Sequence, residues 1–323
     1  MSQRHTFRIA VRQFGPFESA IRKQFAAYKA ASGSALELEL VALDLNPLAE
    51  QRAFAARFGY PLAPPQTWPQ FTDMARFFTR PNQNLYGTVF AAFPDGHNTV
   101  YDFCLHLWSR GGELTDAAGN VTLDTPQARA ALDFYRQMAA DRTATYPDPM
   151  QIDSVQSGAL FREGRIAMMV NWFGFAAVCE QPNSPTRGKV AVTTLPASEG
   201  QPPASLSVYW ILALAAGSPH KAEGYAFLRH VGTPEMDKRT TLEGGIGCRL
   251  STWADPDVNA AIPYYHRLAD LSRNARTLPR SREFPKLAHI LDEIVQQALG
   301  TPDATDAILR RAQERAQTIR LDF

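Results

Sequence analysis

The chain has 323 residues, of which 45% are hydrophobic and 20% are charged. This length exceeds what one simple core usually fills, so we expect a globular protein of two lobes. The 33 basic and 32 acidic residues nearly cancel, and no basic cluster stands out, which argues against nucleic acid or an anionic membrane surface as a partner.

Three cysteines, Cys104, Cys179 and Cys248, are spread singly along the chain without a C-x-x-C pair. Their odd count and spacing argue against a disulfide framework and a zinc site, so we expect buried free thiols. The seven histidines show no metal-binding spacing. No run of roughly 18 apolar residues predicts a membrane span, and the N-terminal segment MSQRHTFRIAVRQFGP lacks the apolar core of a signal peptide.

The N-terminal segment predicts a βαβ unit. A strand is expected at residues 7–11, followed by an amphipathic helix at residues 17–31 that Gly33 stops. Leu and Glu then alternate over residues 36–43, which is typical of a half-buried strand.

A capping box marks the next helix. Thr67 and Gln70 have the required spacing, so a helix is predicted to begin there and to continue to Phe78. Trp68 is interpreted as a packing anchor at the helix start rather than as a ligand platform, because its flanks are apolar. A strand is expected at residues 87–93.

Two further helices are predicted in the middle of the chain, at residues 98–113 and at residues 126–138, the second capped by Thr125. The first turn of the earlier helix, with Tyr101 and Asp102, is expected to face a cleft. Its other side carries apolar residues for the core.

A buried strand is expected at residues 166–171, and large aromatic residues follow it directly. Asn171 ends the strand, and Trp172 and Phe173 come next. Because α/β sheets usually bind ligands at the carboxyl ends of their strands, this aromatic ledge is a candidate ligand surface.

Residues 189–251 hold a characteristic order of elements. A short strand ends in Leu-Pro, a Gly/Pro/Ser-rich link follows, and a second strand at residues 206–213 carries Tyr209 and Trp210. Two helix starts, Ser-Pro at 218 and Thr-Pro at 233, lead to a glycine-rich loop that ends at Arg249. The remaining predicted helices are at residues 255–270, 285–299 and 304–319.

This order of elements resembles the C-terminal half of family 1 extracellular solute-binding proteins, the sugar receptors of bacterial ABC importers. Three shorter segments are similar to signatures of the same family: FAARFG from Phe54, PQTWPQF from Pro65, and FREGRIAM from Phe161. The resemblance covers nearly all of the chain.

The resemblance implies an α/β fold of the type II periplasmic-binding class, with two lobes joined by a hinge. Residues 1–48 and 205–250 would form the N-terminal lobe, and residues 49–204 and 251–323 the C-terminal lobe. Between Leu48 and Ala49, however, the family has a long segment that this chain lacks. We therefore expect a shortened N-terminal lobe, and ligand contacts from that segment are not carried over.

Sugars have flat apolar faces and a rim of hydroxyls, so receptors stack them on aromatic rings and bind the rim with planar polar groups. The tryptophans could equally be core residues, a core position is favoured for Tyr209, and Arg249 could form a structural salt bridge. The candidate ligand-binding residues are Tyr101, Asp102, Asn171, Trp172, Phe173, Tyr209, Trp210 and Arg249, of which Tyr101 and Arg249 match family ligand positions.

The predicted function is that of a periplasmic substrate-binding protein that delivers a carbohydrate or polyol to an ABC permease in the inner membrane. We expect a monomer that is not an enzyme and uses no cofactor or metal. One alternative is a sugar-modifying enzyme on a similar scaffold, although no convergent carboxylates or nucleophile–base pair occur in the sequence. Another is a truncated homologue that no longer supports transport.

Overall fold

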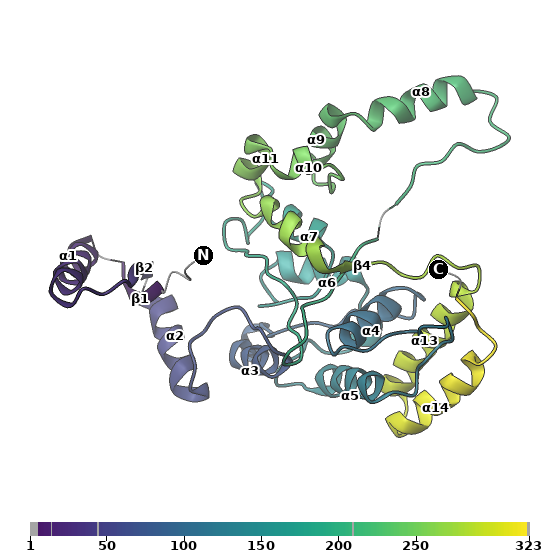
Figure 1. The fold of residues 1–323 in the computed structure, drawn as a ribbon, viewed down its shortest axis with the longest axis horizontal. Helices are drawn as coiled ribbons and strands as arrows, with labels where there is room; N and C mark the ends of the chain where they lie inside the picture. Colours follow the sequence, from purple (N-terminus) through teal and green to yellow (C-terminus); the bar gives the residue numbers. More distant parts are fainter. Residues whose placement is uncertain (1–5, 14, 44, 209, 322–323) are drawn as a thin grey trace. The chain divides into compact units, whose positions relative to one another are not determined.

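The computed structural model divides into two compact units, Met1–Pro64 and Pro65–Phe323 (Figure 1). The predicted division into lobes, 1–48 with 205–250 and 49–204 with 251–323, stays a prediction. The residues that the structure describes are 6–13, 15–43, 45–208 and 210–321.

The first unit contains the predicted βαβ arrangement. Strands β1 (Thr6–Arg12) and β2 (Glu37–Leu43) run parallel, and α1 (Gly15–Ser32) connects them. Gly33 adopts a φ of 66° and donates its N–H to the Lys29 carbonyl, which ends the helix as its sequence predicts. A second helix, α2 (Leu45–Phe58), completes the unit.

The second unit is mainly helical. Its longer helices are α3 (Trp68–Phe78), α4 (Asn98–Trp108), α5 (Pro126–Ala140), α6 (Ser154–Arg162), α8 (Lys221–Val231), α9 (Pro234–Leu242), α13 (Phe284–Gly300) and α14 (Thr305–Ala316). Its shorter elements are α7 (Phe173–Val178), α10 (Leu250–Trp253), α11 (Pro256–Ala261), α12 (Leu268–Leu271), the 3-10 turns Pro81–Gln83, Pro149–Gln151, Tyr265–Arg267 and Ser272–Asn274, and two-residue strands β3 (Ser205–Leu206) and β4 (Ala275–Arg276).

The main core of this unit lies between α3, α4, α5, α13 and α14. Each of these helices turns its apolar face inward, and Phe103, Leu132, Leu291 and Leu309 are at most 1% exposed. The capping box predicted at the start of α3 is confirmed, since Thr67 accepts a hydrogen bond from the Gln70 N–H and Gln70 reaches back. The local helix signals and the burial of these helices therefore agree.

A second core forms where α7 meets the helical turns that precede β4. It buries Ala176 and Ala177 of α7 against Val258, Tyr264 and Tyr265. The chain reaches this region from β3 through residues 207–249, which we call the arm and which include α8 and α9 (Figure 1). It returns to the main core through β4, which pairs in parallel with β3.

Several predicted strands are shorter than expected. Residues 86–88 pair in parallel with residues 144–146 on one side and 165–168 on the other, as isolated bridges and single hydrogen bonds. The predicted strands at 87–93 and 166–171 are therefore wrong as ladders, because too few consecutive residues pair. The predicted strand at 206–213 is reduced to β3, and the chain beyond it is irregular in the described residues.

Three helix predictions need correction. The predicted helix at 255–270 is broken into α11, a 3-10 turn and α12, because Pro263 cannot donate the hydrogen bond that a continuous helix needs. Helix α4 ends at Trp108 rather than at residue 113, and the chain then turns through Gly111 at a φ of 74°. His220, not Ser218, precedes α8, and its side chain makes no capping hydrogen bond.

The cysteine prediction is confirmed in part. Cys104 and Cys179 are buried and free, whereas Cys248 is free and exposed, in the glycine-rich loop before α10. No helix in the described ranges is long and apolar enough to cross a membrane.

Candidate functional site

Two of the predicted ligand residues meet in the structure. Tyr101 lies in the first turn of α4, and Trp172 immediately precedes α7. Their rings meet edge to face, with centroids 5.4 Å apart and planes at 83°. Both side chains are half-buried, so the pair offers ring surface to solvent while resting on the fold. We call this pair the aromatic wall.

A histidine that the sequence analysis missed extends this wall. The ring of His97 lies 5.8 Å from that of Tyr101 and is inclined to it by 70°. His97 precedes Tyr101 by four residues, the spacing that places two residues on one side of a helix start. That spacing is the signal that could have identified it.

The loop before α4 holds His97 in place. The Asp95 carboxylate accepts hydrogen bonds from the backbone N–H groups of His97 and Asn98, at 3.0 and 2.9 Å. The Nδ1 atom of His97 lies 3.1 Å from the Asp95 carbonyl oxygen, which requires a proton on Nδ1. In the neutral ring Nε2 is then the acceptor, available to a ligand hydroxyl.

Asn171 supports Trp172, one of the two residues of the aromatic wall, through hydrogen bonds. Its amide nitrogen donates to the Ser154 carbonyl and to the Ser157 hydroxyl, both at 2.9 Å, and its amide oxygen accepts the Trp172 N–H at 2.7 Å. These bonds use both ends of the amide. Asn171 thereby links Trp172 to α6, and its own ligand role stays a prediction.

The structure places Phe173 in packing. Its ring contacts those of Tyr264 and Tyr265 edge to face, at 6.1 and 5.3 Å, at the border of the second core. Phe173 thus packs against the second core, and its ligand role stays a prediction.

Asp102 is half-buried beside the main core, where it lines a small pocket together with the core residues Phe71 and Phe90. Tyr135 donates a hydrogen bond to its carboxylate at 3.4 Å, and burial raises the pKa of Asp102 to about 7. Its neighbour His106 is buried, and burial together with the Arg110 charge holds the pKa of His106 well below its usual value. Asp102 and Tyr101 are adjacent in sequence, but their side chains leave α4 about 100° apart and therefore meet different neighbours.

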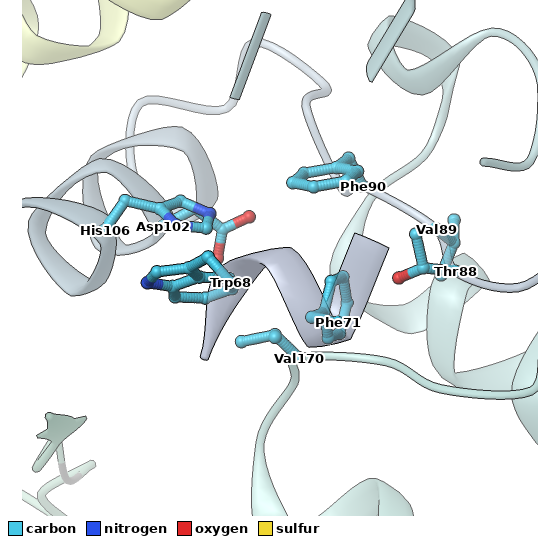
Figure 2. Close-up of a pocket in the computed structure, with 8 residues that line it drawn as sticks. All are labelled: Trp68, Phe71, Thr88, Val89, Phe90, Asp102, His106 and Val170. Carbon is cyan, nitrogen blue, oxygen red and sulfur yellow. The ribbon is translucent and has the colours of Figure 1, made fainter. Parts of the chain in front are cut away.

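Asp102 and His106 line a small pocket of about 10 Å³ (Figure 2). This volume is near the minimum for a single water molecule and far too small for a sugar. Figure 2 shows Asp102 and His106 side by side on α4, facing the Trp68 ring of α3.

The remaining candidates lie apart from the wall. Arg249 donates from its guanidinium to the Gly232 carbonyl at the end of α8, and its backbone N–H bonds to Asp237. Trp210 is 94% exposed in the arm. Tyr209 lies outside the described residues. The ligand roles of Trp210 and Arg249 stay predictions, and Arg249 makes a carbonyl contact instead of the salt bridge weighed for it.

No group of three or more His, Cys, Asp or Glu side chains in the described part of the chain is arranged to hold a metal ion. The wall offers two aromatic rings in edge-to-face contact for an apolar face, and an imidazole beside them.

Comparison with known proteins gives consistent results. The model of the bacterial extracellular solute-binding protein family matches residues 39–238. A probable ABC transporter-binding protein of Deinococcus radiodurans is 28% identical over 245 residues, 73% of this chain and 57% of that protein. A putative ABC transporter periplasmic-binding protein of Escherichia coli K12, YcjN, is 30% identical over 100 residues, 30% of this chain and 23% of that protein. The chain thus spans 57% and 23% of the lengths of these two relatives.

Two solved structures share the fold. An ABC transporter solute-binding protein from Agrobacterium radiobacter K84, in complex with ribitol, has a TM-score of 0.71 and 21% identity, over 97% of this chain and 98% of that one. Maltose-bound MalE3 of T. maritima has a TM-score of 0.73 and 18% identity, with the same coverage. These likenesses confirm the predicted fold class, the α/β type II periplasmic-binding fold.

Proposed function

Because this chain belongs to the bacterial extracellular solute-binding protein family, we propose that it is the substrate-binding component of an ABC importer. The relatives named above carry ABC transporter descriptions, and this role implies a membrane permease as partner and a periplasmic location. The proposed ligand is a sugar or polyol, in keeping with the ribitol and maltose held by the two solved structures.

One observation carries the choice of ligand. The Tyr101–Trp172 wall is a rigid, half-buried aromatic surface whose two rings are fixed by their contact with each other and by Asn171. The apolar C–H face of a sugar ring gains from stacking on such a surface, and hydroxyls at its edge can be bound by His97. A strongly charged ligand would need an ion-pair partner, and neither ring supplies one.

We propose binding without turnover. A glycosidase needs two carboxyl groups that converge on one bond, one of them as general acid. Asp102 has the raised pKa of such an acid, but its carboxylate accepts a hydrogen bond from Tyr135 and lines a pocket of about 10 Å³, which is too small for a sugar. Glu113, which follows α4, is paired with Arg276, which supports a structural role for Glu113.

Isothermal titration calorimetry with ribitol, D-mannitol, D-tagatose and maltose tests this proposal. We expect at least one to bind and to be recovered unchanged. Trp172→Ala should weaken that binding about 10- to 100-fold, because the lost stacking surface contributes roughly 1.5–3 kcal/mol. Phe227→Ala, which removes an exposed aromatic ring of α8, is the matched control and should bind like the parent protein.

A second candidate is a homologue that no longer supports transport. It is favoured by the exposed apolar surface of the arm and by the segment missing between Leu48 and Ala49. Absence of binding to all four probes, with a cooperative unfolding transition intact, would favour this candidate over the first. Binding that survives Trp172→Ala would instead keep the function and contradict the site.

A further inference from the structure

The two rings of the aromatic wall come from distant parts of the chain, yet both are held by one short segment. This segment, residues 149–157, contains a 3-10 turn and the start of α6, and we call it the support segment. Two rings can receive the apolar face of a ligand only while they keep their relative position. The residues that hold Tyr101 and Trp172 in place therefore bear on the affinity of the site.

One part of the support segment holds the chain that leads into α4. The backbone N–H groups of residues 92 and 93 donate to the Pro149 and Ile152 carbonyls, both at 3.0 Å. From there the chain enters α4, in whose first turn Tyr101 lies. The position of the Tyr101 ring is thus tied to the support segment through the backbone.

The other part of the support segment holds Trp172 through Ser157, which is 2% exposed. The Ser157 hydroxyl donates to the Ser154 carbonyl at 3.0 Å and accepts an N–H of the Asn171 amide at 2.9 Å. The oxygen of the same amide accepts the Trp172 N–H at 2.7 Å. Because Ser157 and Ser154 both bind the nitrogen of this amide, they fix the orientation of the oxygen that binds Trp172.

Close packing makes this support rigid. Gln156 donates its backbone N–H to Asp153 at 2.7 Å and receives the Asp153 N–H at 3.0 Å, which fixes the start of α6. A Cβ at Gly158 would lie 2.2 Å from Cδ1 of Phe175, so α7 rests directly on α6. All of these contacts lie within the unit Pro65–Phe323.

We propose that Ser157 is a positioning residue of the ligand site: through Asn171 it holds the Trp172 ring where, with Tyr101, that ring receives the ligand. The inference rests on the proposed function and extends it, because it gives a buried side chain a part in ligand affinity. Since Ser157 acts through Asn171, its effect must vanish when the Asn171 amide is removed.

Calorimetry with the four probes named above tests the effect on affinity. Ser157→Ala should weaken the binding of any probe that the parent protein binds by about 3- to 10-fold, the loss typical of one buried hydrogen bond. In an Asn171→Ala background, Ser157→Ala should cause no further loss. A full further loss in that background would overturn the proposed route through Asn171.

Ser109→Ala is the matched control. Ser109 is 0% exposed, and its hydroxyl likewise donates to the carbonyl three residues earlier, at 3.2 Å, and accepts a side-chain N–H, that of Trp68 at 3.0 Å. It differs from Ser157 in lying at the end of α4, whereas Tyr101 lies at its start. Ser109→Ala should therefore bind the probes like the parent protein, and equal losses in the two variants would overturn the inference.

Fluorine NMR of the full chain labelled with 5-fluorotryptophan tests the position of the Trp172 ring without a ligand. The chain has five tryptophans, and Trp172→Phe identifies the signal of Trp172. Ser157→Ala should shift or broaden this signal, because the ring lies 5.4 Å from that of Tyr101 and senses any change in their geometry. Ser109→Ala should leave it in place.

These two measurements separate the inference from the function on which it rests. An unchanged Trp172 signal in Ser157→Ala overturns the inference, and so does a probe affinity equal to that of the parent protein. If the parent protein binds none of the probes, the proposed ligand is contradicted, and the fluorine spectrum alone decides whether Ser157 positions Trp172.

Discussion

The main core and the arm contain helices of similar length whose burial is opposite. Helix α5 begins with a capping threonine and a proline, and it buries six residues. Helix α8 has a comparable length and apolar content, yet it buries none of its residues. A helix therefore forms with or without a capping side chain, whereas its burial depends on a facing surface that the rest of the chain must supply.

The largest expected difference between the two regions comes from their tryptophans. Trp68 is 4% exposed, donates its indole N–H to Ser109 and contacts three aromatic neighbours. Trp68→Ala should lower the free energy of unfolding by about 3–5 kcal/mol, through lost burial and the cavity left behind. Trp210→Ala should change it by less than about 0.5 kcal/mol, because its ring is 94% exposed.

Urea denaturation followed by circular dichroism measures both values, at protein concentrations of roughly 1 μM. If both variants lost the same free energy of unfolding, the Trp210 ring would contribute as much to stability as the Trp68 ring, and the expected difference between arm and core would be wrong.

The sequence predicted the local features well. The capping box at Thr67, the stop at Gly33 and the parallel βαβ unit follow from residues close together in the chain, and the structure confirms them. The strands predicted at 87–93, 166–171 and 206–213 were wrong, because strand pairing depends on residues far apart in the chain. Whether residues 87–93 form a ladder depends on how many residues of 144–146 and 165–168 lie beside them, and no local pattern contains that information.

The candidate site likewise has features that the sequence predicted and features that it could not predict. Tyr101 and Trp172 were named from their places at a helix start and a strand end, and the structure brings them into contact. The surroundings of Asp102 could not be predicted, because its partner Tyr135 comes from a different helix 33 residues away. Long-range packing, not residue type, separates a surface carboxylate from a buried one.

The second prediction concerns the pH dependence of the core. In the folded protein Asp102 holds its proton up to about pH 7 and His106 stays neutral. In the unfolded chain His106 is protonated below about pH 6.5, and Asp102 is ionised above about pH 4. Between these two values the proton is therefore on His106 in the unfolded chain and on Asp102 in the folded protein. The two states thus bind equal numbers of protons at this pair between about pH 4 and 6.5, so the pair adds little slope there.

Asp102→Asn removes this balance. Only the unfolded state then takes up a proton, at His106, so stability should fall by about 1.4 kcal/mol per pH unit below about pH 6.5. Between pH 7.5 and pH 5.0 the variant should lose about 2 kcal/mol relative to the parent protein, measured by urea denaturation at both values. Asp148→Asn, an exposed site, serves as control and should track the parent. Parallel curves for Asp102→Asn would refute the coupling.

The smallest expected effect comes from the helix caps. Thr67 and Thr233 both cap proline-containing helix starts, α3 in the core and α9 in the arm. Replacing Thr67 by Ala should cost about 1 kcal/mol of global stability, and Thr67→Ser should restore most of it. Replacing Thr233 by Ala should leave global unfolding within about 0.3 kcal/mol, because the arm opens without the core.

The lost cap at Thr233 should appear in local opening instead. Amides of α9 are expected to exchange with solvent about five times faster in Thr233→Ala, since about 1 kcal/mol of helix stability is removed from a segment that already opens below the global free energy. Hydrogen exchange read by mass spectrometry on peptides of α9 and α3 measures both effects in one experiment. If Thr233→Ala lowered global stability as much as Thr67→Ala and left α9 exchange unchanged, the arm would unfold only together with the core, because its helices would then be held by contacts as strong as those around α5.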